Sequence, residues 1–178
     1  TTVSGNAVFD SSAVFGAFGA WSVNFSASDP AVTLTSVTIN LAPTGLFLDT
    51  TFQLFGPGAA LTQDFGNTSG AAATGFTSIS PATAATRDGA TSFTLNFSDF
   101  GNGESFGFGM DVDECNNSFN PVTTLGCSLV TGAEFAGATA TFNFGIPGLG
   151  YSKTVSFNEI PNGNNYDAIA SFDAEIPE

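Results

Sequence analysis

Hydrophobic and polar residues alternate with a period of two in segment after segment of this chain. Trp21, Val23 and Phe25 recur at every second position, with serine and asparagine residues between them. The same alternation recurs in the segments 37–41, 93–98, 106–113, 138–144 and 168–172. Because successive side chains of a strand point to opposite faces, this pattern predicts half-buried strands, and helical periodicity is nearly absent.

Two segments depart from simple alternation. The apolar residues before Thr35 occupy the opposite phase to those after Ser36, so the segment 32–41 is predicted to carry a bulge there or to pack on both faces. Residues 62–88 are poor in large apolar side chains and rich in Gly, Ala, Thr and Ser. We expect loops in that segment, with one short strand around residues 76–79.

About nine strands, separated by Gly, Pro and Asn turn signals, predict an all-β fold. The length of 178 residues suits one core, so we expect a single antiparallel β-sandwich domain over residues 1–178, of jelly-roll or immunoglobulin-like type. Hydrophobic residues make up 42% of the chain and charged residues 10%, which indicates a folded chain despite a pI near 4.1. Twenty phenylalanines against one tryptophan and two tyrosines favour core packing over recognition.

The charge balance excludes several classes of function. Arg87 and Lys153 are the two basic residues against sixteen acidic ones, which gives a formal net charge of −14. Such a polyanion is repelled by nucleic acids and anionic membranes. The chain has no histidine and no GxSxG motif, so we expect no enzyme. No apolar run is long enough to cross a membrane and no signal peptide is visible, so we expect any export signal to have been removed.

The two cysteines point to a compartment. Cys115 and Cys127 flank a polar stretch that contains a proline and reads as a loop. A disulfide between them is the natural pairing and predicts an oxidising, extracellular setting, whereas the alternative is two unrelated buried thiols. In the loop-entropy picture such a bond contributes roughly 3 kcal/mol.

The densest acidic cluster is Asp111, Asp113 and Glu114. Alternation places Asp111 and Asp113 on the same face at a strand end, where their oxygens could bind Ca²⁺. Bound calcium would also offset part of the net charge. The alternative is a solvated strand end.

Three stretches carry a family resemblance: FGFGMDVD at 106–113, TGAEFAGATATFNF at 131–144 and FDAEIPE at 172–178. They resemble secreted bacterial proteins of the PEP-CTERM type, which carry a β-sandwich ectodomain and a C-terminal sorting tail beginning near a Pro-Glu-Pro motif. Pro177 and Glu178 are the part of that motif present in this sequence. The resemblance implies export and a cell-surface or matrix setting, and it implies no enzymatic activity.

Two functions remain in view. The first is an extracellular structural protein, the subunit of a surface filament, sheath or biofilm matrix. In this hypothesis residues 1–10 are donated as a strand to the next copy. The same run could instead pair within its own sandwich. The second is a secreted carbohydrate-binding module, for which Trp21, Tyr151 and Tyr166 are the available aromatic platforms, although Trp21 lies on a predicted core face.

Two Asn-x-Ser/Thr sequons also lie in predicted loops. They begin at Asn67 and Asn116 and are candidate glycosylation sites.

Overall fold

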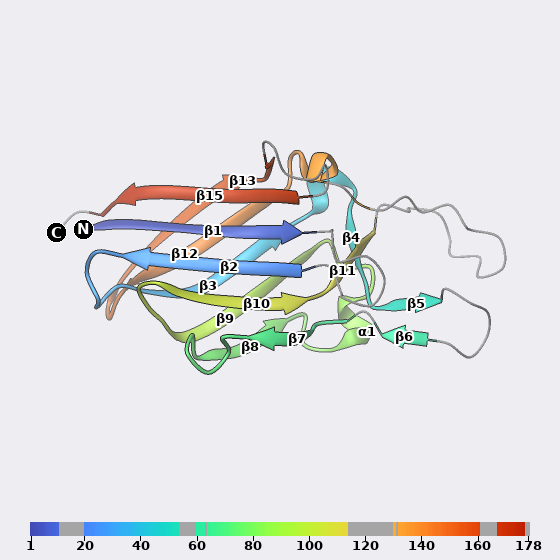
Figure 1. Ribbon diagram of the computed structural model, residues 1–178, viewed down its shortest axis with the longest axis horizontal. Coiled ribbons are helices and arrows are strands. Elements are labelled where there is room, and N and C mark those ends of the chain that lie inside the picture. The colour runs from blue at the N-terminus through green and yellow to red at the C-terminus, as the bar shows by residue number, and fades with distance from the viewer. Residues whose placement is uncertain are drawn as a thin grey trace.

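The computed structural model describes residues 1–10, 20–53, 60–62, 64–113, 130, 132–160 and 167–176. Its two large sheets are antiparallel throughout and stack face to face, as Figure 1 shows. The chain is therefore an antiparallel β-sandwich, as the alternation predicts.

The six-stranded sheet contains, in spatial order, β14 (Asn158–Glu159), β15 (Asp167–Glu175), β1 (Thr2–Asp10), β2 (Ala20–Ala27), β10 (Glu104–Gly109) and β7 (Gly66–Ser69). The five-stranded sheet contains β13 (Leu149–Ser156), β12 (Thr139–Ile146), β3 (Thr33–Asn40), β9 (Ser92–Phe100) and β8 (Phe76–Ser80). The remaining elements are short: the pair β4 (Phe47–Asp49) with β11 (Asp111–Asp113), the pair β5 (Thr51–Gln53) with β6 (Ala60–Thr62), the helix α1 (Ala84–Arg87), and the 3-10 turns η1 (Ala42–Thr44) and η2 (Gly132–Phe135).

The inward positions of the alternation form one core between the sheets. Phe25 of β2 meets Phe144 of β12 with ring centroids 6.1 Å apart, which joins the two layers. Trp21 lies edge-on to Phe93 of the opposite sheet at 5.4 Å, and its Nε1–H donates to the Met110 carbonyl at 3.0 Å. The buried ring is thus fully satisfied, as an indole in a core requires.

The irregularity predicted in the segment 32–41 is a β-bulge. The pairing of β3 with β9 shifts register between Leu34 and Ser36, and the pairing with β12 shifts at the facing position between Asn143 and Phe144. The extra residue brings the apolar positions before and after Thr35 into the same core, because a bulge reverses the side-chain phase.

The number of strands is higher than the nine expected. Alternation over residues 106–113 reads as one strand, but the chain divides at Met110 and β11 leaves the six-stranded sheet to pair with β4. Strands of two to four residues, such as β14 and β7, are too short to show a period. The short strand expected around residues 76–79 is confirmed as β8.

Residues 1–10 occupy the interior of a sheet. β1 pairs with β15 from Thr2 to Asp10 on one side and with β2 on the other. The structure thus contains the arrangement left open above, in which this run pairs within its own sandwich. Donation of β1 to a neighbour would require both ladders to break.

Candidate functional site

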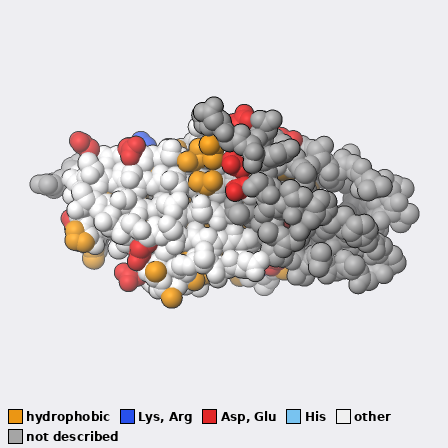
Figure 2. All heavy atoms as spheres, in the orientation of Figure 1, with side chains coloured by type: hydrophobic (Ala, Val, Ile, Leu, Met, Phe, Trp, Pro, Cys, Tyr) orange, Lys and Arg blue, Asp and Glu red, His pale blue; other side chains and the backbone are white. Residues whose placement is uncertain are grey.

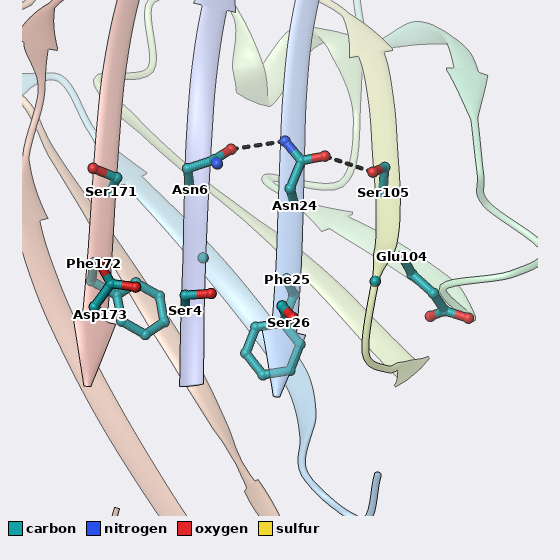
Figure 3. Close-up of a pocket in the computed structure, with 12 residues that line it drawn as sticks. Ser4, Asn6, Asn24, Phe25, Ser26, Glu104, Ser105, Ser171, Phe172 and Asp173 are labelled. Atoms are coloured by element: carbon teal, nitrogen blue, oxygen red, sulfur yellow. Dashed lines mark hydrogen bonds between the residues drawn. The ribbon is translucent and has the colours of Figure 1, made fainter. Parts of the chain in front are cut away.

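A shallow polar groove crosses the outer face of the six-stranded sheet. The strand register aligns Ser171, Asn6, Asn24 and Ser105 in one row across β15, β1, β2 and β10. Within this row Asn24 Nδ2 donates to Asn6 Oδ1 at 2.8 Å, and the Ser105 hydroxyl donates to Asn24 Oδ1 at 2.6 Å (Figure 3). The groove has a volume of about 440 Å³.

The floor of the groove depends on a glycine, Gly5, which has no side chain. A Cβ on Gly5 would lie 2.8 Å from Phe172 Cε1, so the phenylalanine ring packs directly beneath the backbone of β1. Phe172 in turn stacks on Phe144 with ring centroids 5.5 Å apart. Both rings are buried, and the groove therefore presents hydroxyl and amide groups rather than an aromatic surface.

Carboxylates lie at the margins of this face. Asp173 and Glu104 border the groove on opposite sides, from β15 and from the first position of β10. The Glu104 carboxylate accepts a hydrogen bond from the Gly101 amide at 2.7 Å, which fixes its orientation. Figure 2 shows the same distribution, with Asp and Glu side chains spaced around a largely uncharged face. The site is thus suited to neutral groups that donate and accept hydrogen bonds.

A second pair of carboxyl groups lies where β1 and β15 meet at the other end of the sheet. Asp10 and Asp167 are directly opposite in the register. Burial raises the pKa of Asp167, and the charge of Asp10 and a hydrogen bond to it act in the same direction. Asp167 Oδ1 is buried without a partner among the described residues. Neither residue lines the groove, so this pair at the end of β1 and the start of β15 is separate from the candidate site.

Two of the three residues predicted to bind calcium are described by the structure. Asp111 and Asp113 both belong to β11 with Val112 buried between them, and the register sets Asp111 opposite Asp49. Asp111 Oδ1 accepts from the Val112 amide at 3.0 Å. Glu114 lies outside the described residues, and within these no three acidic or cysteine side chains gather into a metal-binding group. Calcium binding stays a prediction.

Some of the other predicted site residues are described by the structure and some are not. Cys115, Cys127, Asn116 and Tyr166 lie outside the described residues, so the disulfide stays a prediction. Trp21 is 2% exposed and cannot serve as a sugar platform.

Asn67 and Tyr151 are both described. Asn67 is exposed on β7 with a positive φ of 51°. Tyr151 is half-buried and stacks on Phe144 at 6.1 Å.

The sequence pattern does not identify the groove residues. It places Asn24 at an outward position of its strand, and Asn6 lies in the run 1–10, whose pairing partner the pattern leaves open. Outward polar residues occur on every strand, and nothing in the sequence says which strands are neighbours. The groove arises from the order β15-β1-β2-β10, which sequence alternation does not specify.

Comparisons of the chain with protein-family models, with curated proteins and with solved structures found no match. Within the described residues, no helix has the length and apolar character needed to span a bilayer.

Proposed function

We propose that this chain is an extracellular structural protein, a subunit of a surface filament, sheath or biofilm matrix, that associates through a sheet edge. The observation that carries the proposal is β13. This strand of eight residues closes one side of the five-stranded sheet, and among the described residues no strand pairs with its outer side. A long strand with unpaired N–H and C=O groups is a template for pairing with another chain.

The other sheet edges are protected in the usual ways. β14 has two residues, β7 has four, and the register of β7 with β10 is irregular. β8 has five residues and carries a register shift between Phe76 and Ser78. Short length and bulges both discourage edge pairing. β13, in contrast, pairs with β12 over its whole length without a shift.

Charge sets the conditions for association. At −14 per subunit, copies repel one another, so assembly must draw on β-pairing and apolar contact and should strengthen as salt shortens the Debye length to about 8 Å. β13 itself carries no acidic residue and carries Lys153, which is exposed. Local charge repulsion is therefore weak at the edge offered for pairing. The resemblance to exported surface proteins agrees with this role.

Sedimentation velocity and electron microscopy of the purified protein test the proposal. We expect association that grows with protein concentration and with ionic strength from low to physiological salt. A protein that remains monomeric at the highest attainable concentration, with salt and calcium present, would remove the basis for a structural role.

A second candidate function is favoured by the polar groove. Its row of amide and hydroxyl groups offers donors and acceptors of the kind that bind sugar hydroxyls, which supports a carbohydrate-binding module. The described residues that line the groove include no exposed aromatic platform, so we rank this function below the structural one.

Affinity electrophoresis in gels that contain neutral polysaccharides tests the second function. Asn24→Ala should abolish any retardation if the groove binds the glycan. Asn143→Ala is the matched control, because Asn143 lies on the outer face of the other sheet and its side chain also makes a cross-strand hydrogen bond, donating to the Ser36 hydroxyl at 2.9 Å. Equal retardation of both variants would place binding elsewhere.

A further inference from the structure

The register of β13 with β12 determines which of its backbone N–H and C=O groups point toward β12 and which point outward. The Phe157 amide, one residue beyond the strand, donates to the Ala138 carbonyl at 2.9 Å and continues the β12–β13 register. Because hydrogen-bonded and non-hydrogen-bonded positions alternate in an antiparallel ladder, the odd-numbered residues of β13 bond to β12. The N–H and C=O groups of the even-numbered residues, Gly150, Ser152, Thr154 and Ser156, therefore point away from the sheet.

We propose that β13 pairs antiparallel with β13 of a second copy about a two-fold axis at Ser152, so that two five-stranded sheets join into one. This inference rests on the proposed function and names the partner and the register of its first association step. A two-fold contact closes at a dimer, so growth into a filament or sheath requires a further contact between dimers. Around such an axis Ser152 faces Ser152 of the second copy in a hydrogen-bonded pair, and Gly150 faces Thr154. The outward backbone groups of one copy thereby meet those of the other.

The side chains of β13 are complementary to themselves in this register. Tyr151 faces Lys153 of the second copy, which places an ammonium group beside an aromatic ring. Leu149 faces Val155, and Leu149 is 49% exposed in the isolated chain. An exposed leucine at the end of the hairpin is thus covered by an apolar neighbour. Both contacts occur twice because the arrangement is symmetric.

The neighbouring register is disfavoured by charge. Shifting the axis by one residue to Lys153 keeps the same backbone parity but sets Lys153 directly opposite its own copy. Like charges directly opposite across two strands are destabilising. Registers further from Ser152 shorten the ladder. The axis at Ser152 is therefore the one that combines a long ladder with favourable cross-strand pairs.

A second β13 also fits this edge better than the part of β15 that β14 leaves uncovered. β14 covers Ala168 and Ile169 of β15, and the part of β15 beyond them carries Asp173 and Glu175. Pairing that segment between copies would bring acidic residues together, and pairing it with β13 would set an eight-residue strand against a shorter one. The charge of the chain and the length of its edges thus both favour the pairing of β13 with β13 of a second copy.

Cysteine cross-linking tests the register. Hydrogen-bonded pairs have Cα atoms about 5.5 Å apart, within the range a disulfide spans. Ser152→Cys should give a covalent dimer under mild oxidation. Thr154→Cys, which retains Lys153 and faces Gly150 of the second copy, and the wild-type protein should give little. Failure of Ser152→Cys to cross-link, or efficient cross-linking of Thr154→Cys in its place, would overturn the proposed register.

A proline substitution tests the edge without a covalent bond. The Ser152 amide points away from β12, so Ser152→Pro removes no bond of the folded monomer but removes a donor from the interface. We expect this variant to weaken dimerisation at least about tenfold, while Ser152→Ala, which retains the amide, dimerises as the wild-type protein does.

The outcomes separate the inference from the function on which it rests. If Ser152→Pro assembles as readily as the wild-type protein, pairing through β13 is overturned, and the association that remains must use another surface of the chain. If the wild-type protein never associates, both fall. Circular dichroism and thermal unfolding of each variant establish that the monomer fold is intact.

Discussion

Arg87 holds Asp64 through two parallel hydrogen bonds, from Nε to Oδ1 at 2.7 Å and from Nη2 to Oδ2 at 2.6 Å. A third bond runs from Nη1 to the Pro81 carbonyl at 2.7 Å. The arginine side chain is 7% exposed and that of the aspartate 18%. The planar guanidinium thus ties together the turn after β6, the loop after β8 and the helix α1 in a chain with two basic residues in all.

Replacing Arg87 should therefore be costly. Arg87→Lys retains the charge but cannot make the fork of parallel bonds, so we expect the free energy of unfolding to fall by about 2–3 kcal/mol. Urea denaturation at neutral pH measures the change. The reciprocal exchange at the other basic residue, Lys153→Arg, is the control, and on an exposed strand position it should change stability by less than about 0.5 kcal/mol. Equal effects of the two exchanges would contradict the structural role of the pair.

The same pair should make the protein sensitive to acid. The hydrogen bond from Arg87 lowers the pKa of Asp64, although burial acts in the opposite direction. A carboxyl whose folded pKa is depressed contributes stability that is present above its unfolded pKa of about 3.9 and is lost as the pH falls through its folded pKa. The stability difference between wild type and Asp64→Asn, measured by urea denaturation across this range, should therefore shrink towards low pH. A difference independent of pH would show that the aspartate charge is not involved.

Asp167 should behave in the opposite way. Its raised pKa means that the folded protein prefers the protonated form, a contribution that is present at low pH and is lost as the pH rises through the folded pKa. Asp167→Asn should thus be more stable than wild type at pH 7, and the gain should disappear in acid. Asp173→Asn, an exposed position on the same strand, is the control and should change stability little at either pH. A destabilised Asp167→Asn would mean that the carboxylate has a favourable partner.

The alternation of residues predicts the layer structure because burial acts on one side chain at a time. In the segment 106–113 the alternating apolar residues Phe106, Phe108, Met110 and Val112 are all buried. Even the bulge near Thr35 is visible, since a change of phase is a local signal. These features depend on residues within a few positions of one another.

The pairing of strands is not local, and this is where the sequence is insufficient. Asn6 and Asn24 bond across β1 and β2, and Ser105 joins them from a strand some eighty residues later in the chain. Arg87 and Asp64 come from a segment with little periodicity, so nothing marks them as partners. Sequence alternation identifies outward side chains, but the groove and the ion pair depend on which outward side chains become neighbours.

Calcium binding at the end of β11 remains open to a direct test. If Asp111, Asp113 and Glu114 bind the ion, millimolar Ca²⁺ should raise the unfolding temperature, because a ligand that binds the native state stabilises it. Asp111→Asn should remove the shift, whereas Asp99→Asn, an exposed carboxylate on β9, should retain it. Calorimetry with a matched magnesium sample decides the matter. An equal shift with magnesium would indicate general charge neutralisation rather than a site.

The predicted bond between Cys115 and Cys127 bears on both the compartment and the stability of the chain. If the two residues are bonded, alkylation under denaturing conditions should label the protein after reduction but not before, and intact-mass measurement should show two labels per chain. A variant with serine at both positions should unfold with a free energy lower by roughly 3 kcal/mol, because the unfolded chain regains the freedom that a short closed loop removes. Single serine variants provide the internal control, since each leaves one thiol that labels without reductant. Two thiols that react in the unreduced wild-type protein would contradict the disulfide and would also remove the cysteine argument for an oxidising, extracellular setting.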